Sequence, residues 1–168
     1  MRELVNSAIE QLCTAFARGG CNPTPIIDIG VLVASADGKV DDSERTLLLE
    51  MFSTLLETSI NTEVVDHLVT ASLEIIEAAG AAPRARLVGA ILRDCNAVEP
   101  GLVVALAVAF ASEGLSSAER TVVSRIAEGA GFAEAELSAL EARVRAMGDI
   151  DPASVREALA SSRRSLTT

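Results

Sequence analysis

The sequence predicts an all-α fold, a compact bundle of about eight or nine helices arranged as two pseudo-repeated halves. Three observations lead to this prediction. Apolar residues recur every three or four positions along most of the 168 residues, as they do on one face of a helix. No segment sustains the period-two alternation of a half-buried strand. Two junctions between expected helices also share an acidic sequence.

The first expected helix, residues 2–18, ends at Gly19-Gly20. Its apolar residues share one face: Leu4, Val5, Ala8, Ile9, Leu12, Cys13 and Phe16. Thr24 and Pro25 then supply an N-cap and a first-turn proline to a helix over 26–33, which is apolar on nearly every side. We therefore expect this second helix to lie in the centre of the core. Asp28 interrupts it, and should be paired or exposed.

Helical periodicity predicts further amphipathic helices over 47–56 and 64–76. Gly80 ends this pair, Pro83 opens a helix that includes residues 87–92, and Pro100 opens the apolar stretch 102–111. Two more helices are expected at 122–127, ended by Gly129 to Gly131, and at 137–147. The length fits one domain, residues 1–168, with a core over about 24–147. The helix at 2–18 and a short helix at about 152–162 are additions to that core.

Composition limits the partners and the compartment. Lysine and arginine total 14 against 24 acidic residues, and a net charge of −10 repels nucleic acids and anionic lipid surfaces. The longest apolar run, Leu102 to Ala111, is far shorter than the roughly 20 residues of a membrane span, so no transmembrane segment is expected. The N-terminus has no pattern of a secretory signal, and the three cysteines form no Cys-x-x-Cys pair. We expect a cytoplasmic protein.

The two acidic junctions run from Ala34 to Thr46 and from Ala111 to Thr121. Each follows a nearly all-apolar helix and precedes an amphipathic one, and they lie about 75 residues apart. The second copy is one residue shorter inside the turn. This self-similarity predicts two halves packed about a pseudo-two-fold axis.

Helix capping explains part of each junction. Gly38 and Gly114 fit left-handed residues after a helix, while Asp41-x-x-Glu44 and Ser116-x-x-Glu119 fit capping boxes. Capping does not explain Asp37 and Glu113. An acidic residue in the last turn of a helix faces the negative end of the helix dipole, which typically costs about 0.3 to 1 kcal/mol.

A bound divalent cation would explain the acidic residues that helix capping does not explain. In the first junction four carboxylates, those of Asp37, Asp41, Asp42 and Glu44, fall within eight residues. Oxygen ligands favour Ca²⁺ or Mg²⁺, with Mn²⁺ less favoured, and nothing indicates an organic cofactor. Glu113 and Glu119 are the candidate ligands of the second junction. The pattern is not an EF-hand, because Lys39 and Asp42 occupy its third and sixth positions.

The segment Ala36-Asp37-Gly38-Lys39-Val40-Asp41-Asp42-Ser43-Glu44-Arg45 and the second copy, ending Ser116-Ser117-Ala118-Glu119-Arg120, resemble the TerB-like family. That family comprises the tellurite-resistance protein TerB and the N-terminal region of DjlA-type co-chaperones. The resemblance covers about residues 24–147. It implies a compact helical fold, acidic motif residues that hold metal ions, and partners among stress-response proteins near the inner membrane.

By position, Asp37, Asp41 and Glu44 match the first motif of the family, and Glu113, Ser116 and Glu119 match the second. The second copy departs from the pattern, because Glu113 stands where Asp is expected and one turn residue is missing.

No catalytic constellation is visible in the sequence. The only histidine, His67, lies on the polar face of its helix, and neither a Glu-x-x-His motif nor a nucleophile with a paired base is present. We therefore expect a non-catalytic acidic helical domain that acts as a divalent-cation sensor or scaffold. The alternative is a metal-free protein-interaction module whose acidic junctions only cap helices. A homo-oligomer is compatible with either interpretation.

Overall fold

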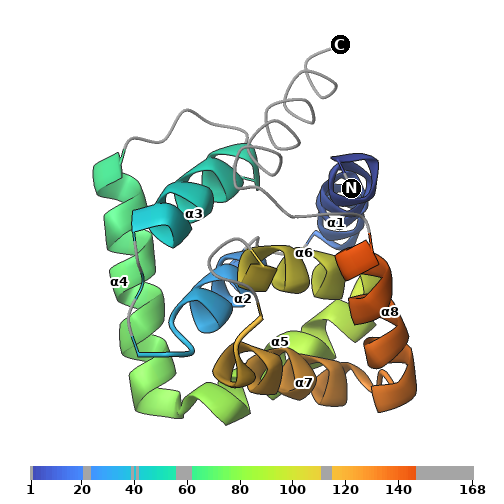
Figure 1. Ribbon diagram of the computed structural model, residues 1–168. Coiled ribbons are helices and arrows are strands. Elements are labelled where there is room, and N and C mark those ends of the chain that lie inside the picture. The colour runs from blue at the N-terminus through green and yellow to red at the C-terminus, as the bar shows by residue number, and fades with distance from the viewer. Residues whose placement is uncertain are drawn as a thin grey trace.

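The computed structural model describes residues 2–20, 24–38, 40, 42–55, 62–110 and 115–146. These residues form eight α-helices and, within those ranges, no strand, so the all-α prediction is confirmed (Figure 1). The helices are α1 (Arg2–Gly19), α2 (Thr24–Ala34), α3 (Asp42–Leu55), α4 (Thr62–Ala79), α5 (Ala81–Asp94), α6 (Val98–Phe110), α7 (Ser117–Ala130) and α8 (Glu134–Ala146). The helix expected at 152–162 lies outside the described residues.

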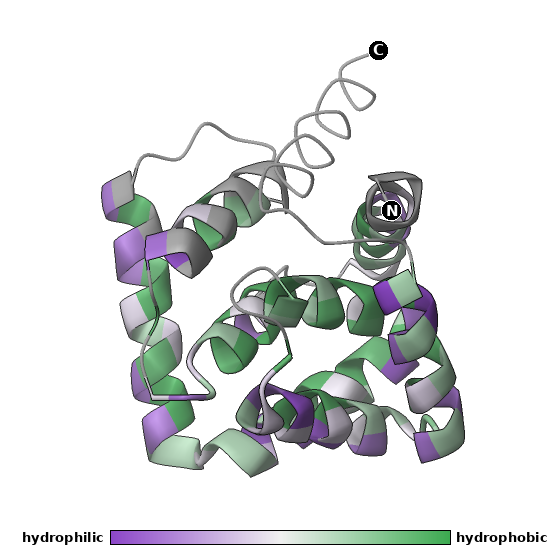
Figure 2. Cartoon of the chain, viewed as in Figure 1, coloured by the Kyte–Doolittle hydropathy of each residue, from purple (hydrophilic) through white to green (hydrophobic). Residues whose placement is uncertain are grey.

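Two almost entirely apolar helices, α2 and α6, form the centre of the molecule. Every residue from Ile26 to Ala34 is buried, and so is every residue from Gly101 to Ala109. The two helices pack against each other, and the remaining helices surround them (Figures 1 and 2). Burial on all sides explains why both helices lack the polar face that the amphipathic helices around them carry.

The predicted repeat is visible in the packing. Helices α1 to α4 correspond in order to α5 to α8, because equivalent residues are buried in each pair. For α3 and α7 the equivalent buried residues are Leu48/Val123, Met51/Ile126 and Phe52/Ala127. For α4 and α8 they are Val69/Leu137, Ser72/Leu140 and Ile76/Val144. For α1 and α5 they are Ile9/Ala85, Leu12/Val88 and Phe16/Leu92. The repeat therefore includes α1 as well as the helices next to the acidic junctions.

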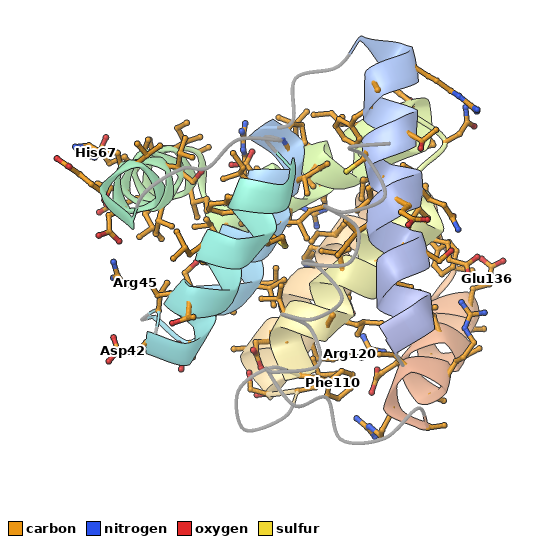
Figure 3. All side chains as sticks on the ribbon, turned by 90° about the horizontal axis from the view of Figure 1, so that it is seen from above. Asp42, Arg45, His67, Phe110, Arg120 and Glu136 are labelled. Carbon is orange, nitrogen blue, oxygen red and sulfur yellow. The ribbon has the colours of Figure 1, made fainter. Side chains whose placement is uncertain are left out.

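The two halves differ in how one pair of helices meets. Helix α5 packs along α7 so closely that a Cβ atom on Gly89 would lie 2.0 Å from the Ile126 carbonyl oxygen. A Cβ atom on Gly129 would lie 2.1 Å from the Arg86 carbonyl oxygen. Among the described helices, their counterparts α1 and α3 do not pack along one another, and both views show them apart (Figures 1 and 3).

A buried ion pair joins α2 of the first half to α5 of the second half. The Asp28 carboxylate on α2 is fully buried, pairs with the Arg84 guanidinium on α5 and accepts a hydrogen bond from Ser72 Oγ on α4 at 3.2 Å. This confirms that an acidic residue in the central helix is paired. Val104 occupies the equivalent position in α6, at the same 76-residue offset that relates α1 to α5.

Candidate cation-binding junctions

The first junction leaves α2 through a short turn. The backbone N–H groups of Ser35 and Ala36 donate to the Val31 and Val33 carbonyl oxygens, and Gly38 N–H donates to Ser35 at 3.0 Å. Gly38 has a φ of 98°, in the region that favours glycine, as the sequence predicted. Val40 is half-buried and packs against the core, so the turn is held to the domain at that residue.

Two of the predicted cation ligands in this junction are described with their side chains. Asp37 is exposed in the turn after α2, and Asp42 is exposed at the first position of α3. Thr46 Oγ1 donates a hydrogen bond to the Asp42 carbonyl oxygen at 2.7 Å. Asp41 and the side chain of Glu44 lie outside the described residues, so the ligand set of this junction stays a prediction.

The second junction contains the predicted capping box. Ser116 has extended backbone angles, and its Oγ accepts a hydrogen bond from Glu119 N–H at 3.2 Å. In return, Ser116 N–H donates to Glu119 Oε2 at 2.7 Å. Glu119 is only 5% exposed, and one oxygen of its carboxylate already accepts this hydrogen bond. Glu113, the other predicted ligand here, lies outside the described residues.

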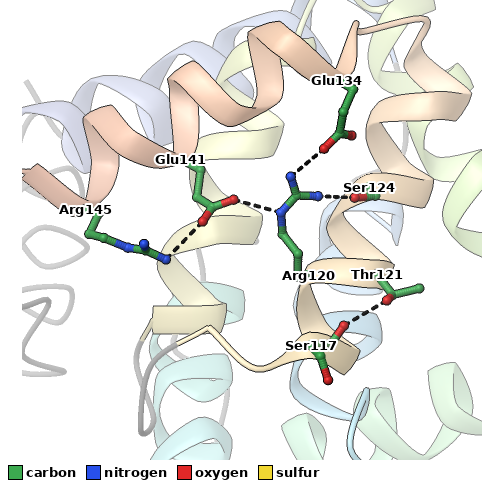
Figure 4. Close-up of polar contacts among 7 residues, drawn as sticks. All are labelled: Ser117, Arg120, Thr121, Ser124, Glu134, Glu141 and Arg145. Carbon is green, nitrogen blue, oxygen red and sulfur yellow. Dashed lines mark hydrogen bonds and ion pairs between the residues drawn. The ribbon is translucent and has the colours of Figure 1, made fainter.

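Arg120 connects the second junction to α8 (Figure 4). Its guanidinium donates to Glu134 Oε1 at 2.6 Å, to Glu141 Oε2 at 2.8 Å and to the Ser124 hydroxyl. The hydrogen bond to Glu134 raises the pKa of the Arg120 guanidinium, with Glu141 adding to it against the opposing effect of burial. Through these hydrogen bonds Arg120 fixes the start of α7 against α8.

The first junction has a weaker version of the same connection. Arg45, the counterpart of Arg120, pairs with Asp66 at the start of α4, which is the counterpart of Glu134. Both side chains are 44% exposed, whereas Arg120 is 27% exposed. Helix α4 offers no second carboxylate at the position of Glu141, because Leu73 stands there. The role of these two arginines was not predicted, although an arginine directly follows the motif glutamate in both copies.

Within the described part of the chain, no three His, Cys, Asp or Glu side chains converge as a metal site. His67 is exposed on α4 and points away from the domain, with Nδ1 2.7 Å from the Glu63 carbonyl oxygen (Figure 3). This agrees with a solvated histidine. Cys13 and Cys95 are partly buried against the core, as expected of small apolar side chains.

The family model described as "Tellurite resistance protein TerB" matches residues 25–142, which is more than half of the chain. The chain belongs to the TerB family. The TerB match extends from α2 into α8 and includes both junctions. Neither a curated protein nor a solved structure gives a significant match. Among the TerB helices described here, none has the length and apolarity needed to cross a membrane.

Proposed function

We propose that this chain is a non-catalytic helical scaffold whose first junction binds a divalent cation, Ca²⁺ or Mg²⁺ before Mn²⁺. The observation that carries the proposal is the difference between equivalent positions. Asp41 and Asp42 replace Ser116 and Ser117 of the capped second junction. Together with Asp37 and Glu44 they give four carboxylates within eight residues that run from the end of α2 into the first turn of α3. A hard cation would offset their mutual repulsion.

Membership of the TerB family supports a role in stress resistance of the tellurite type, carried out by binding and not by catalysis. The net charge of −10 favours cations over nucleic acids. On this proposal the chain works in the cytoplasm with other stress-response proteins. The first junction faces these partners, and cation binding changes its conformation. Glu113 and Glu119 are secondary ligands at most, because Glu119 is used in the capping box.

Metal analysis of the purified protein and calorimetric titration with Ca²⁺, Mg²⁺ and Mn²⁺ test the proposal. We expect saturable binding by the native chain and its loss in the Asp37→Asn/Glu44→Gln variant. Glu119→Gln is the matched control, because glutamine preserves a capping box. Absence of both binding heat and thermal shift with all three ions would refute the proposal.

The alternative is a metal-free interaction module, and the second junction favours it, because there the motif glutamate serves as a cap. This alternative makes a distinct prediction for Asp37→Asn. Removing an acidic residue near the negative end of α2 should then stabilise the fold by a few tenths of a kcal/mol, up to about 1 kcal/mol. Under the cation proposal the same variant loses the stabilisation that added Ca²⁺ gives the native protein.

A further inference from the structure

Helix α4 carries a second apolar stripe beside the residues that it buries. The buried positions are Val69, Ser72 and Ile76. The second stripe consists of Val64, Leu68, Ala71, Ile75 and Ala78. Val64 is 42% exposed and Ile75 is 43% exposed. Leu68 is half-buried, and both alanines are exposed. We call these five residues the outer stripe.

The spacing of the outer stripe is that of a helix-pairing surface. Its residues follow one another at alternating intervals of four and three, which is the a and d pattern of a coiled coil. A helix that packs only against its own domain needs one apolar stripe, and α4 already has one facing the core. Of the three large hydrophobic side chains exposed in the described part of the chain, two belong to the outer stripe.

The charged side chains that α4 itself carries are acidic apart from His67, and of these Asp66 pairs with Arg45 on α3. Glu63, Glu74 and Glu77 are exposed on α4, and the helix contains no lysine or arginine. A shallow hollow along the helix is lined by Asp66, His67, Thr70, Ala71 and Glu74. Figure 1 places α4 at the edge of the molecule, and Figure 3 shows His67 pointing outward from it. The surface is therefore open to a partner, and its electrostatic potential favours a basic one.

We propose that the outer stripe docks an amphipathic helix of a partner protein, with an apolar seam flanked by lysine or arginine. Basic flanking residues would face Glu63, Glu74 and Glu77, in the manner of the charges that select coiled-coil partners. A second copy of this chain fits less well. It would bring the same acidic flank and a further net charge of −10 to the interface. This proposal is independent of cation binding at the first junction.

A synthetic helix of about three heptads tests the proposal, with leucine at a and d and lysine at e and g. Binding of this labelled peptide to the full chain is followed by fluorescence anisotropy in the presence of a chelator. We expect Ile75→Gln, and Val64→Gln as a second variant, to weaken binding roughly tenfold. Leu87→Gln is the matched control, because Leu87 on α5 is 48% exposed but lies off the outer stripe. Its binding should equal that of the native chain.

A second pair of peptides tests whether the outer stripe prefers a basic partner helix. The same peptide with glutamate at e and g should bind at least tenfold more weakly than the lysine version. Glu74→Gln should weaken lysine-peptide binding, and Glu10→Gln on the exposed face of α1 should not.

Three results would overturn the proposal. The first is no binding of the lysine peptide, and the second is equal weakening by Leu87→Gln and Ile75→Gln. The third is self-association in sedimentation experiments that Ile75→Gln abolishes, because the stripe would then belong to a second copy. Circular dichroism should show native helicity for all variants, since every changed side chain is exposed.

Discussion

The two halves of the molecule are built from equivalent helices but use their junctions differently. In the second half, the α5–α7 backbones touch at Gly89 and Gly129, and a capping box and Arg120 fix the start of α7. In the first half, α1 and α3 stay apart, Arg45 pairs with one carboxylate among the described residues, and aspartates replace the capping serines. The second half thus uses its motif for helix capping and packing, whereas the first half carries aspartates at the positions of the capping serines.

The largest expected effect concerns the buried ion pair between the halves, whose carboxylate on α2 is replaced by a valine in α6. Asp28→Ala should destabilise the fold by about 3 to 5 kcal/mol, because it leaves the partly buried Arg84 cation without its carboxylate. Urea unfolding measures the loss. The double variant Asp28→Val/Arg84→Met introduces the valine found in α6 and should recover most of the stability. A double variant as unstable as Asp28→Ala would contradict this account.

The helix contact that only the second half makes should give the next effect. Gly89→Ala should cost about 1 to 3 kcal/mol, because its Cβ would meet backbone atoms of α7 that cannot turn aside. Gly30→Ala in α2 is the comparison, since its Cβ would meet the side-chain ends of Leu48 and Met51. Those side chains can adjust, and the better helix propensity of alanine offsets part of the cost. Equal losses in thermal unfolding would argue against a special α5–α7 contact.

The equivalent arginines of the two junctions give a smaller difference. Arg120→Gln removes hydrogen bonds to two carboxylates and should cost about 1 to 2 kcal/mol. Arg45→Gln removes one half-exposed pair and should cost at most about 1 kcal/mol. Chemical denaturation of both variants under one buffer condition checks the order. A larger loss in Arg45→Gln would mean that the first junction is the more rigid one.

The smallest effect is the pH dependence of Glu128, which joins α7 to α5 through Arg86. Hydrogen bonds from Arg125 and then Arg86 lower the pKa of Glu128. Its stabilising contribution is therefore present above the unfolded-state pKa, about 4.3, and is lost as pH falls through the lower folded-state value. NMR titration should show the midpoint rising in Arg125→Gln and, to a smaller extent, in Arg86→Gln. An unchanged midpoint in both variants would contradict the claim that these two arginines lower the pKa of Glu128.

Local chemistry made most of the helices predictable. Apolar periodicity located the amphipathic helices, and unbroken apolar runs located α2 and α6. The Ser116-x-x-Glu119 pattern predicted a capping box that the structure contains. Such features depend on residues a few positions apart, so a sequence pattern is sufficient to identify them.

Contacts between distant helices could not be predicted in the same way. Periodicity predicted that Asp28 should be paired or exposed, but it could not select Arg84, which lies 56 residues away. Gly129 looked like part of a helix end, whereas it lies inside α7 and permits the contact with α5. The left-handed residue after α7 is Gly131, with a φ of 71°. The cation site formed by Asp37, Asp41, Asp42 and Glu44 stays a prediction, because Asp41 and the side chain of Glu44 lie outside the described residues.

The central claim is that the two junctions differ in cation binding, and a heteronuclear NMR titration with Ca²⁺ tests it residue by residue. The account predicts saturable shifts of the backbone amides from Asp37 to Arg45, with little change from Ser116 to Thr121. The Asp37→Asn/Glu44→Gln variant should lose those shifts while keeping its native spectrum. Equal shifts at both junctions, or none at the first, would contradict the account.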